Sequence, residues 1–144
     1  MDVKQISVFL ENKPGALNEF AKLLQKNDIN MRALCLAEIS EYGVLRLIVN
    51  DTYELSALLR SEGYIFNTTS VLAVEIEDKP GSLVSILSAL ENVGINVSYS
   101  YAFTSKLPGK AYIILRVDDV KAGTKALSEA GIRMLTQEDL EKLQ

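Results

Sequence analysis

The sequence of 144 residues contains no histidine and a single cysteine, Cys35. Without histidine, neither a Ser-His-Asp nor a Cys-His catalytic arrangement can form. One cysteine and no histidine also exclude the usual zinc and copper ligand sets. A single cysteine cannot form a disulfide within the chain, which is typical of a reducing compartment. Because the phosphate-binding motifs GxxxxGK and GxGxxG are also missing, we expect a protein that is not an enzyme and has no cofactor.

Clusters of positive charge and long apolar runs are absent as well. No two Lys or Arg residues are adjacent, and the formal net charge is −4, whereas nucleic-acid binding needs a clustered basic surface. The longest apolar stretches, such as residues 111–117, are strand-sized and fall short of the roughly 20 residues that span a bilayer. The opening MDVKQISVFL lacks the features of a secretory signal. We therefore expect a cytoplasmic protein that binds neither nucleic acid nor membrane.

What the sequence does contain is a repeat. The stretch ENKPGAL at residues 11–17 returns as EDKPGSL at residues 77–83, which is 77 − 11 = 66 positions later. Identical residues keep this register at Glu11/Glu77, Lys13/Lys79, Pro14/Pro80, Gly15/Gly81, Leu17/Leu83, Leu24/Leu90, Ile29/Ile95, Asn30/Asn96 and Gly43/Gly109. After a two-residue insertion, the matches continue at Asp51/Asp119, Leu59/Leu127 and Gly63/Gly131. We infer two duplicated domains, residues 1–69 and 70–144.

Both halves predict the same order of elements. In the first half, the patterns predict strands at 3–11, 30–39, 44–50 and 64–69 and helices at 16–27 and 51–62. In the second half, they predict strands at 71–77, 96–103 and 110–117 and helices at 82–93 and 118–130, followed by residues 131–136 and a short helix after Thr136. Asp51 and Glu54 have the spacing of a capping box, and Gly123 is expected to weaken its helix.

Each half is therefore a βαββαβ unit of the α+β class. Right-handed crossovers lead from this order to a four-stranded antiparallel sheet with both helices on one face, which is the ferredoxin-like arrangement. The other sheet face and the sheet edges still need cover. A homodimer is therefore expected.

The repeated motifs resemble those of a known family. ENKPGAL…DINMRALCLAE…YGVLRLIVND and EDKPGSL…GINVSYSYAF…GKAYIILRVDD both look like ACT domains, the small regulatory modules of amino-acid metabolism. The resemblance covers nearly the whole chain, twice, and is to free-standing tandem ACT proteins, so no catalytic domain is expected beside the two modules. It implies two ferredoxin-like ACT domains that pair side by side into an extended antiparallel sheet with the helices on one face. It also implies that a free amino acid binds at the interface between two ACT units.

The resemblance also implies which residues form the sites. The first pocket would combine a turn and a strand start, at Asn12, Lys13, Pro14, Gly15, Ala16 and Leu17 with Asn96, Val97 and Ser98. The second would combine Asp78, Lys79, Pro80, Gly81, Ser82 and Leu83 with Asn30, Met31 and Arg32.

The Pro-Gly turn suits an amino acid on physical grounds alone. A helix start presents unpaired main-chain N–H groups and a partial positive charge, so the N–H groups of Gly15, Ala16 and Leu17 could hold a carboxylate. The Asn12 amide can donate and accept, whereas the ionised Asp78 can only accept. We therefore expect the pocket with Asn12 to be the better site, and the pocket with Asp78 to be weaker, reversed in ligand orientation or empty.

Simpler interpretations remain beside these. A single Pro-Gly turn would only begin a helix, and it is the repetition that favours a binding site. Lys13 and Lys79 are interpreted as solvated turn charges, and Arg32 as part of a surface ion pair. Cys35 is interpreted as a small buried side chain, and Tyr99, Tyr101 and Phe103 as core or interface packing. Ser98 and Ser100 lie on the strand face opposite to these aromatic residues, where they either line the pocket or simply form a polar face.

The resulting hypothesis is a non-catalytic sensor whose effector is a free amino acid and whose target is a metabolic enzyme. The alternative is a regulatory or assembly subunit of a biosynthetic enzyme, of the acetolactate synthase regulatory-subunit type, which acts by protein contact and binds no small molecule. Neither the identity of the amino acid nor that of the enzyme follows from the sequence.

Overall fold

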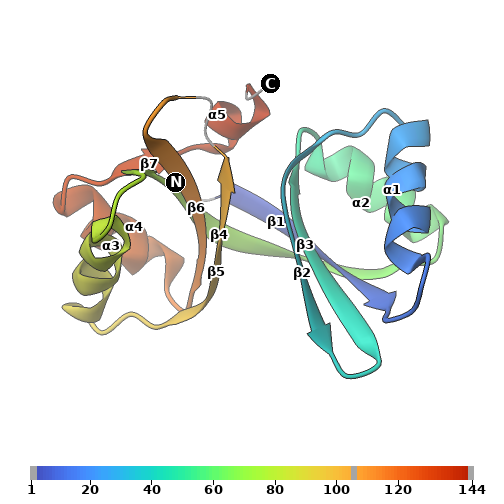
Figure 1. The fold of residues 1–144 in the computed structure, drawn as a ribbon, viewed down its shortest axis with the longest axis horizontal. Coiled ribbons are helices and arrows are strands. Elements are labelled where there is room, and N and C mark those ends of the chain that lie inside the picture. The colour runs from blue at the N-terminus through green and yellow to red at the C-terminus, as the bar shows by residue number, and fades with distance from the viewer. Residues whose placement is uncertain (1–2, 105–106, 143–144) are drawn as a thin grey trace. The chain divides into compact units, whose positions relative to one another are not determined.

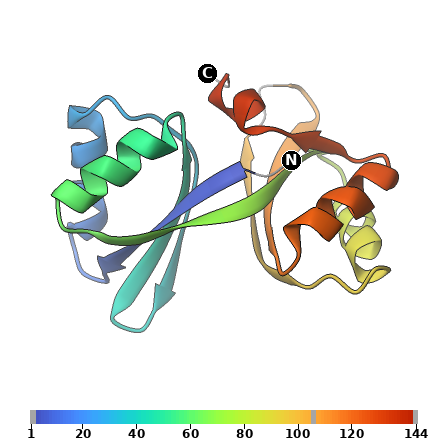
Figure 2. The ribbon, with the colours of Figure 1, turned by 180° about the vertical axis from the view of Figure 1, so that it is seen from behind.

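The computed structural model describes residues 3–104 and 107–142, which form two compact units. The N-terminal unit contains residues 4–69 and 140–142, and the C-terminal unit contains residue 3 with residues 70–104 and 107–139. Within each unit, two helices lie on the same side of a sheet (Figure 1, Figure 2). Each unit is described by itself below.

The N-terminal unit has the predicted βαββαβ order. Its elements are β1 (Val3–Glu11), α1 (Ala16–Lys26), β2 (Met31–Ile39), β3 (Tyr42–Val49), α2 (Thr52–Ser61) and the first part of β4 (Ile65–Glu77). The strands are ordered β2–β3–β1–β4, and β3 pairs antiparallel with both β1 and β2. Since the first and third strands lie at the centre, this is the ferredoxin-like arrangement.

The C-terminal unit repeats that arrangement. After the second part of β4 come α3 (Ser82–Glu91), β5 (Val97–Thr104), β6 (Lys110–Val117), α4 (Val120–Glu129) and β7 (Arg133–Leu135). The strands are ordered β7–β4–β6–β5, and every pair is antiparallel. The predicted α+β fold of two ferredoxin-like units is therefore confirmed. The short helix α5 (Gln137–Glu141) follows.

Strand β4 differs from its prediction. Separate strands were expected at 64–69 and 71–77, but the structure has one strand from Ile65 to Glu77. Neither glycine nor proline occurs between these residues, so nothing in the local chain interrupts the extended backbone. The first part of β4 belongs to the N-terminal unit, and the part from Ser70 onward belongs to the C-terminal unit.

Each unit has its own hydrophobic core between its helices and its sheet. The core of the N-terminal unit consists of Ile6, Val8, Leu10, Phe20, Leu24, Ile29, Leu45, Leu47, Val49, Leu55 and Leu59. That of the C-terminal unit consists of Leu72, Val74, Ile86, Leu90, Ile95, Leu115, Val117, Leu127 and Met134. Burial of each such side chain contributes roughly 1.5–3 kcal/mol, so the packed helix stripes and strand faces hold each unit together.

Side chains cap three of the helices. Asp51 before α2 and Asp119 before α4 each accept a hydrogen bond from the main-chain N–H three residues on, at 2.9 and 3.0 Å. The sequence pattern predicted that this helix begins at residue 118. It begins at Val120 instead, because Asp119 is the cap. At α5, the Thr136 N–H donates to Asp139 Oδ2 at 2.8 Å, and the Asp139 N–H donates to Thr136 Oγ1 at 3.1 Å. The sequence therefore locates these three helix starts to within two residues.

Candidate functional site

The turn between β1 and α1 leaves its helix start open. Gly15 precedes the helix in the left-handed conformation, with φ 88° and ψ −15°, and no side chain caps the helix. The Ala16 N–H donates to the Lys13 carbonyl at 3.3 Å. Within the described residues, the N–H groups of Gly15 and Leu17 have no hydrogen-bond partner. Two of the three N–H groups that the sequence proposed for a carboxylate therefore remain available.

The turn between β4 and α3 has the same conformation. Gly81 has φ 90° and ψ −14°, and again no side chain caps the helix. The Ser82 N–H donates to the Lys79 carbonyl at 3.3 Å. Helices α2 and α4 are capped by aspartates, so of the two long helices in each unit one has a closed start and the other an open one. An open start carries a partial positive charge and free donors, which is the arrangement that binds a carboxylate.

The two turns differ at their first residue. The amide nitrogen of Asn12 donates to the main-chain oxygen of Ser40 at 3.1 Å and lies 3.4 Å from Glu38 Oε2. Asn12 therefore ties the turn to the β2–β3 hairpin, and its amide oxygen is the atom left to accept from a ligand. Asp78, at the equivalent position, has no such donor. Sequence reasoning missed Glu38 and Ser40, because they are 26 and 28 residues away from Asn12.

A small pocket lies beside the first turn. It has a volume of about 80 Å³. Its lining consists of Leu10, Glu11, Asn12, Lys13, Ala16, Leu17, Leu36, Glu38 and Gly43. Since one water already occupies about 30 Å³ of liquid, this pocket can accept part of an amino acid but cannot enclose it. A ligand bound here needs a second wall.

The start of the second strand of a unit, which the sequence analysis assigned to a binding pocket, does not form the second wall of the pocket beside that unit's own turn. Met31 pairs with Val49, whereas Glu11, just before the turn, pairs with Tyr42 at the other end of β3. Asn30 and Asn12 are therefore at opposite ends of the same sheet. The C-terminal unit has the same register, since Val97 pairs with Val117. In each unit, the turn and the strand start therefore lie at opposite ends of the sheet.

The strand starts share a feature that the sequence did not reveal. The register of β2 shifts between Met31 and Ala33, and that of β5 shifts between Val97 and Tyr99, so Arg32 and Ser98 occupy equivalent bulges. Bulges often re-aim side chains next to binding sites. Arg32, interpreted as part of a surface ion pair, donates from Nη2 to the main-chain oxygen of Glu141 at 3.0 Å.

In the C-terminal unit, the main chain of the residue before β5 is held by an aspartate. Asn96, which precedes Val97, donates from its main-chain N–H to Asp118 Oδ1 at 3.1 Å. The Asp118 N–H donates back to the Asn96 oxygen at 3.3 Å. This reciprocal pair fixes the main chain of Asn96 and leaves its side chain exposed.

The lysines of the turns are paired rather than simply solvated. Lys13 Nζ lies 2.9 Å from Glu11 Oε2, and Lys79 Nζ lies 2.7 Å from Glu77 Oε2. The hydrogen bond and the charge of Glu11 raise the pKa of Lys13, and those of Glu77 raise the pKa of Lys79. All four side chains are exposed, so the pairs contribute little to stability. Their effect is to neutralise the strand-end carboxylates beside the open helix starts.

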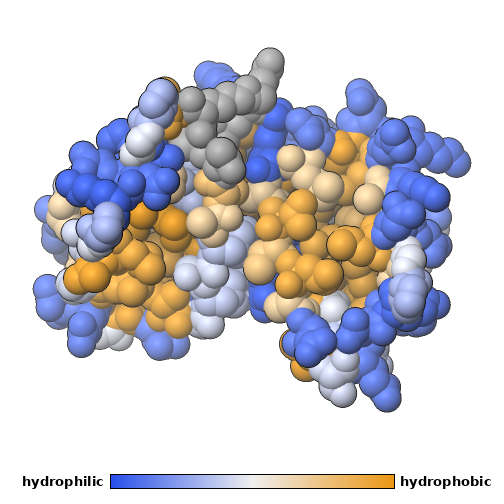
Figure 3. Space-filling view, in the orientation of Figure 1, coloured by the Kyte–Doolittle hydropathy of each residue, from blue (hydrophilic) through white to orange (hydrophobic). Residues whose placement is uncertain are grey.

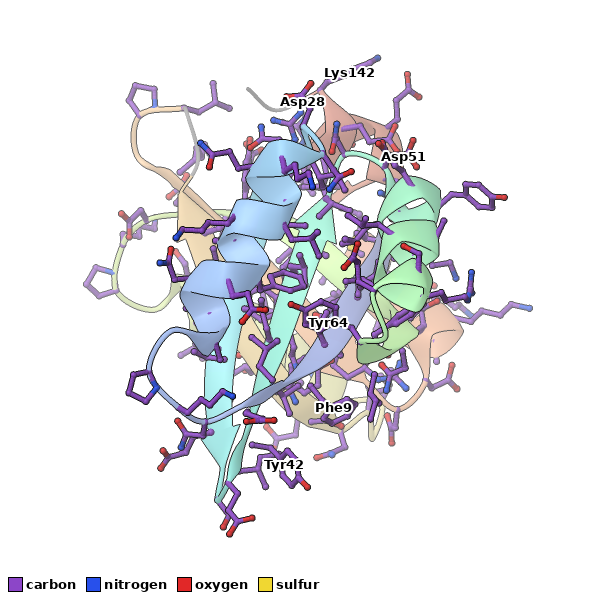
Figure 4. All side chains as sticks on the ribbon, turned by 90° about the vertical axis from the view of Figure 1, so that its right-hand side faces the viewer. Phe9, Asp28, Tyr42, Asp51, Tyr64 and Lys142 are labelled. Atoms are coloured by element: carbon purple, nitrogen blue, oxygen red, sulfur yellow. The ribbon has the colours of Figure 1, made fainter. Side chains whose placement is uncertain are left out.

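A larger groove lies on the other side of each turn, where the strand before the turn separates from the last strand of the unit. In the N-terminal unit the groove has a volume of about 460 Å³, and Phe9, Tyr42 and Tyr64 line it (Figure 4). Glu19 and Glu62 also line it. Burial raises the pKa of Tyr64, with a further contribution from the charges of these two carboxylates. This groove is therefore aromatic and acidic.

The equivalent groove of the C-terminal unit has different chemistry. Its volume is about 380 Å³, and Lys79, Lys110 and Arg133 line it. Ser85 stands at the position equivalent to Glu19. Arg133 bonds to Glu75 Oε2 at 2.8 Å across the paired strands β4 and β7. The duplicated scaffold thus keeps the groove and changes its charge.

Within residues 3–104 and 107–142, no cluster of three or more His, Cys, Asp or Glu side chains is arranged to hold a metal ion. In the same part of the chain, no helix is long and apolar enough to cross a membrane. Cys35 is half-buried rather than fully buried as expected. Phe103 packs against Tyr112 with ring centroids 5.1 Å apart, in line with its interpretation as a packing residue.

Comparison with known proteins identifies relatives of this chain. The family described as an ACT domain pair matches residues 1–144. The crystal structure of protein BT0572 from Bacteroides thetaiotaomicron is similar over 99% of this chain and 98% of that one, with 34% sequence identity and a TM-score of 0.92. Among curated proteins, no sequence matches.

More distant structures share the fold. The ligand-free regulatory subunit of aspartate kinase from Thermus thermophilus has 15% identity and a TM-score of 0.62, covering 90% of this chain and 93% of that one. The regulatory subunit of aspartate kinase from Thermus flavus has 16% identity and a TM-score of 0.59, covering 91% and 94%.

Proposed function

Because this chain belongs to the ACT family, as a pair of ACT domains over residues 1–144, we propose that it is a non-catalytic sensor of a free amino acid. The observation that carries the proposal is the contrast between helix starts. In each unit, the start after the Pro-Gly turn has no side-chain cap, while the other main helix has an aspartate cap. A fold that caps its helices elsewhere leaves donors open at the two repeated turns.

At the first turn, the ligand carboxylate accepts from the N–H groups of Gly15 and Leu17, near the positive end of α1. The ligand ammonium needs acceptors. Asn12 supplies its amide oxygen, because its amide nitrogen is already bonded to Ser40. A second ACT unit supplies the opposite wall through the start of its second strand, at Asn96, Val97 and Ser98 for this turn.

The second turn takes the same ligand less well. Asp78 carries a negative charge where Asn12 is neutral, so it attracts an ammonium and repels a carboxylate. Gly81, Ser82 and Leu83 provide the equivalent helix start, and Asn30 and Met31 provide the equivalent strand start. We expect unequal occupancy of the two sites.

Regulation follows from the need for two walls. An amino acid that touches two ACT units stabilises one arrangement of those units over others, and such a coupling is typically worth about 1–3 kcal/mol. The target is a metabolic enzyme whose affinity for this protein changes with that arrangement. The aspartate kinase regulatory subunits, which share the fold, are examples of proteins in which such a module regulates an enzyme.

A second candidate function is assembly without a ligand. It is favoured by the exposed apolar side chains of α3 and β2, among them Val84 and Leu34, because exposed patches of this kind mark protein contacts. In this case the chain is a regulatory subunit whose role is to hold a biosynthetic enzyme in an active form.

A thermal-shift screen of the free amino acids separates the two functions. A ligand at one hundred times its dissociation constant adds about 2.7 kcal/mol to the free energy of unfolding. The sensor requires at least one amino acid to raise the melting temperature, and the shift should disappear in Gly15→Ala. If no amino acid shifts the melting temperature of the wild-type protein, the assembly function is the better explanation.

A further inference from the structure

The larger groove of the N-terminal unit is not used by the proposed amino-acid site. Its volume of about 460 Å³ is within the range of about 300–1,000 Å³ that is typical of small-molecule sites. Its lining comes from the end of β1, the start of α1, the tip of the β2–β3 hairpin and the α2–β4 connection. All of these segments belong to the N-terminal unit, so this groove is formed by one unit alone.

Aromatic and apolar side chains form one part of the lining, and several of them are exposed. Phe9 is 39% exposed, Tyr42 56% and Ile65 73%. Tyr64 is half-buried, and its ring is held edge-to-face against Phe20 with the ring centroids 5.4 Å apart. In Figure 4, Tyr64 lies between α1 and α2, and Phe9 and Tyr42 follow toward the tip of the hairpin. The groove therefore presents three aromatic rings to a ligand.

Two carboxylates without a counter-ion line the same groove. Glu19 on α1 and Glu62 at the end of α2 are both exposed, and neither has an ion-pair partner in the described part of the chain. A third carboxylate, that of Glu11, is paired with Lys13 at 2.9 Å. The charges of Glu19 and Glu62 are therefore left uncompensated.

The negative charges of these carboxylates act on other groups of the groove. Burial raises the pKa of Tyr64, and the charges of Glu19 and Glu62 raise it further. The hydrogen bond and the charge of Glu11 raise the pKa of Lys13, and the charge of Glu19 adds to their effect. Nearby negative charge raises the pKa of a phenol and of an ammonium alike. Two groups from different elements therefore sense the same negative potential.

The equivalent groove of the C-terminal unit shows that the fold does not require this lining. Two aromatic and two acidic residues of the first groove are replaced in the repeat by residues of another kind. The four pairs are Phe9/Glu75, Glu19/Ser85, Glu62/Ala130 and Tyr64/Ile132. Both units nevertheless have the same order of elements and the same sheet topology. The combination of rings and carboxylates is therefore particular to the N-terminal unit.

A simpler interpretation is that the two carboxylates are solvated surface charges. Figure 3 agrees with it in part, since the outer side of α1 is hydrophilic, whereas hydrophobic residues gather on the surface over α3. Solvated charges do not, however, account for the exposed rings of Phe9 and Tyr42 beside them, because leaving an aromatic side chain in water is unfavourable. Rings and carboxylates together suit a cation, since both attract positive charge.

We propose that this groove binds a small organic amine, an aliphatic chain that carries an ammonium or guanidinium group and no carboxylate. The cationic group lies at Tyr64, close to Glu19 and Glu62, where ring and charges attract it together. The aliphatic part extends along Phe9 and Tyr42. A carboxylate on the ligand would be repelled by the acidic lining, which separates this ligand from a free amino acid. The proposal goes beyond the amino-acid sensor and does not depend on it.

Isothermal titration calorimetry of the full chain tests the site with agmatine and cadaverine as probes. Both amines should bind, and their affinity should fall as the salt concentration rises from about 50 to about 500 mM, because salt screens exposed charges. Pentanediol is the neutral probe with the carbon chain of cadaverine. It should not bind measurably, because the rings and carboxylates recognise the positive charge.

Substitutions locate the binding in the groove. Glu19→Gln and Glu62→Gln should each weaken amine binding about two- to fivefold, and the double variant should weaken it about tenfold. Tyr42→Leu should also weaken binding, whereas Tyr42→Phe should not, because it keeps the ring. Glu91→Gln is the matched control, since Glu91 is an exposed carboxylate at the end of α3, outside the groove. Circular dichroism melts show whether each variant remains folded.

Three results would overturn the inference: no binding of either amine at millimolar concentration, pentanediol that binds as tightly as cadaverine, or a double variant that binds amines as well as Glu91→Gln does. The proposed function fails separately, because an amino acid held at the open helix start needs its carboxylate and does not need Glu19 or Glu62. If amines bind as described but no amino acid changes the melting temperature, the amine site stands and the amino-acid sensor does not.

Discussion

Replacing Gly15 with alanine should separate the role of the turn in folding from its role in binding. Gly15 has φ +88°, and a Cβ built there has no atom within 4 Å. The cost of the substitution is therefore backbone strain alone, about 1–2 kcal/mol for a non-glycine residue in the left-handed region. For a chain of this size, that lowers the melting temperature by about 2–8 °C.

Gly63→Ala is the matched control. Gly63 has φ +77° and also has no atom within 4 Å of a built Cβ, but it ends α2 rather than beginning a helix at a Pro-Gly turn. Both variants should lose the same stability in urea denaturation. Only Gly15→Ala should lose amino-acid binding, because strain at this residue moves its own N–H and that of Leu17.

The expected binding effect is measurable against that background. At a fixed ligand concentration, a tenfold loss of affinity removes about 1.4 kcal/mol of ligand-induced stabilisation. Calorimetric titration and ligand-dependent melts of the two variants measure it. Equal loss of binding in Gly63→Ala would refute the reasoning, since the effect would then come from stability and not from the helix start. A Gly15→Ala protein as stable as wild type would refute the strain argument.

Three further predictions concern single contacts. Asn12→Asp should lower the free energy of unfolding by about 0.5–1.5 kcal/mol, because the donor to Ser40 is lost; denaturant melts measure this. Asp51→Ala should cost about 1 kcal/mol and leave amino-acid binding unchanged, because it removes only a helix cap. Tyr64→Phe should reduce the loss of stability above about pH 10, because Tyr64, with its raised pKa, stabilises the fold only while protonated; melts from about pH 8 to about pH 11 check it.

The order of elements could be predicted because the relevant signals are local. Pro-Gly pairs, aspartates before apolar stripes and alternating strands act within a few residues, and they locate α2 after Asp51 and α4 after Asp119. The duplication added a second, independent copy of every signal. The break between two strands that was expected near Ser70 is absent from β4. No local signal supported it, because the boundary of a repeat does not by itself cause a turn.

The contacts that shape the candidate site could not be predicted, because they connect distant residues. The bond between Asn12 and Ser40 depends on how the β2–β3 hairpin meets the turn. Gly123 illustrates the same limit in the core. Its effect on helix propensity was visible in the sequence, but its reason is that a Cβ would lie 3.0 Å from Leu72 Cδ1. Close packing against β4 therefore favours the glycine that weakens the isolated helix, because Leu72 would have to shift to admit a Cβ.

Comparing equivalent residues of the two units distinguishes those that the fold requires from those that it does not require. Gly15 and Gly81 are identical and share one backbone conformation, so the turn itself is a common requirement. Asn18 and Val84 share the same exposed helix position with opposite polarity, and no core contact explains the change. A substitution that the scaffold does not demand, on a surface that its twin keeps polar, is best explained by a surface that it meets. Because Asn18 shows that a polar side chain is tolerated at this exposed helix position, Val84→Asn should leave the free energy of unfolding nearly unchanged in denaturant melts, and a large loss would show that the fold itself needs the valine.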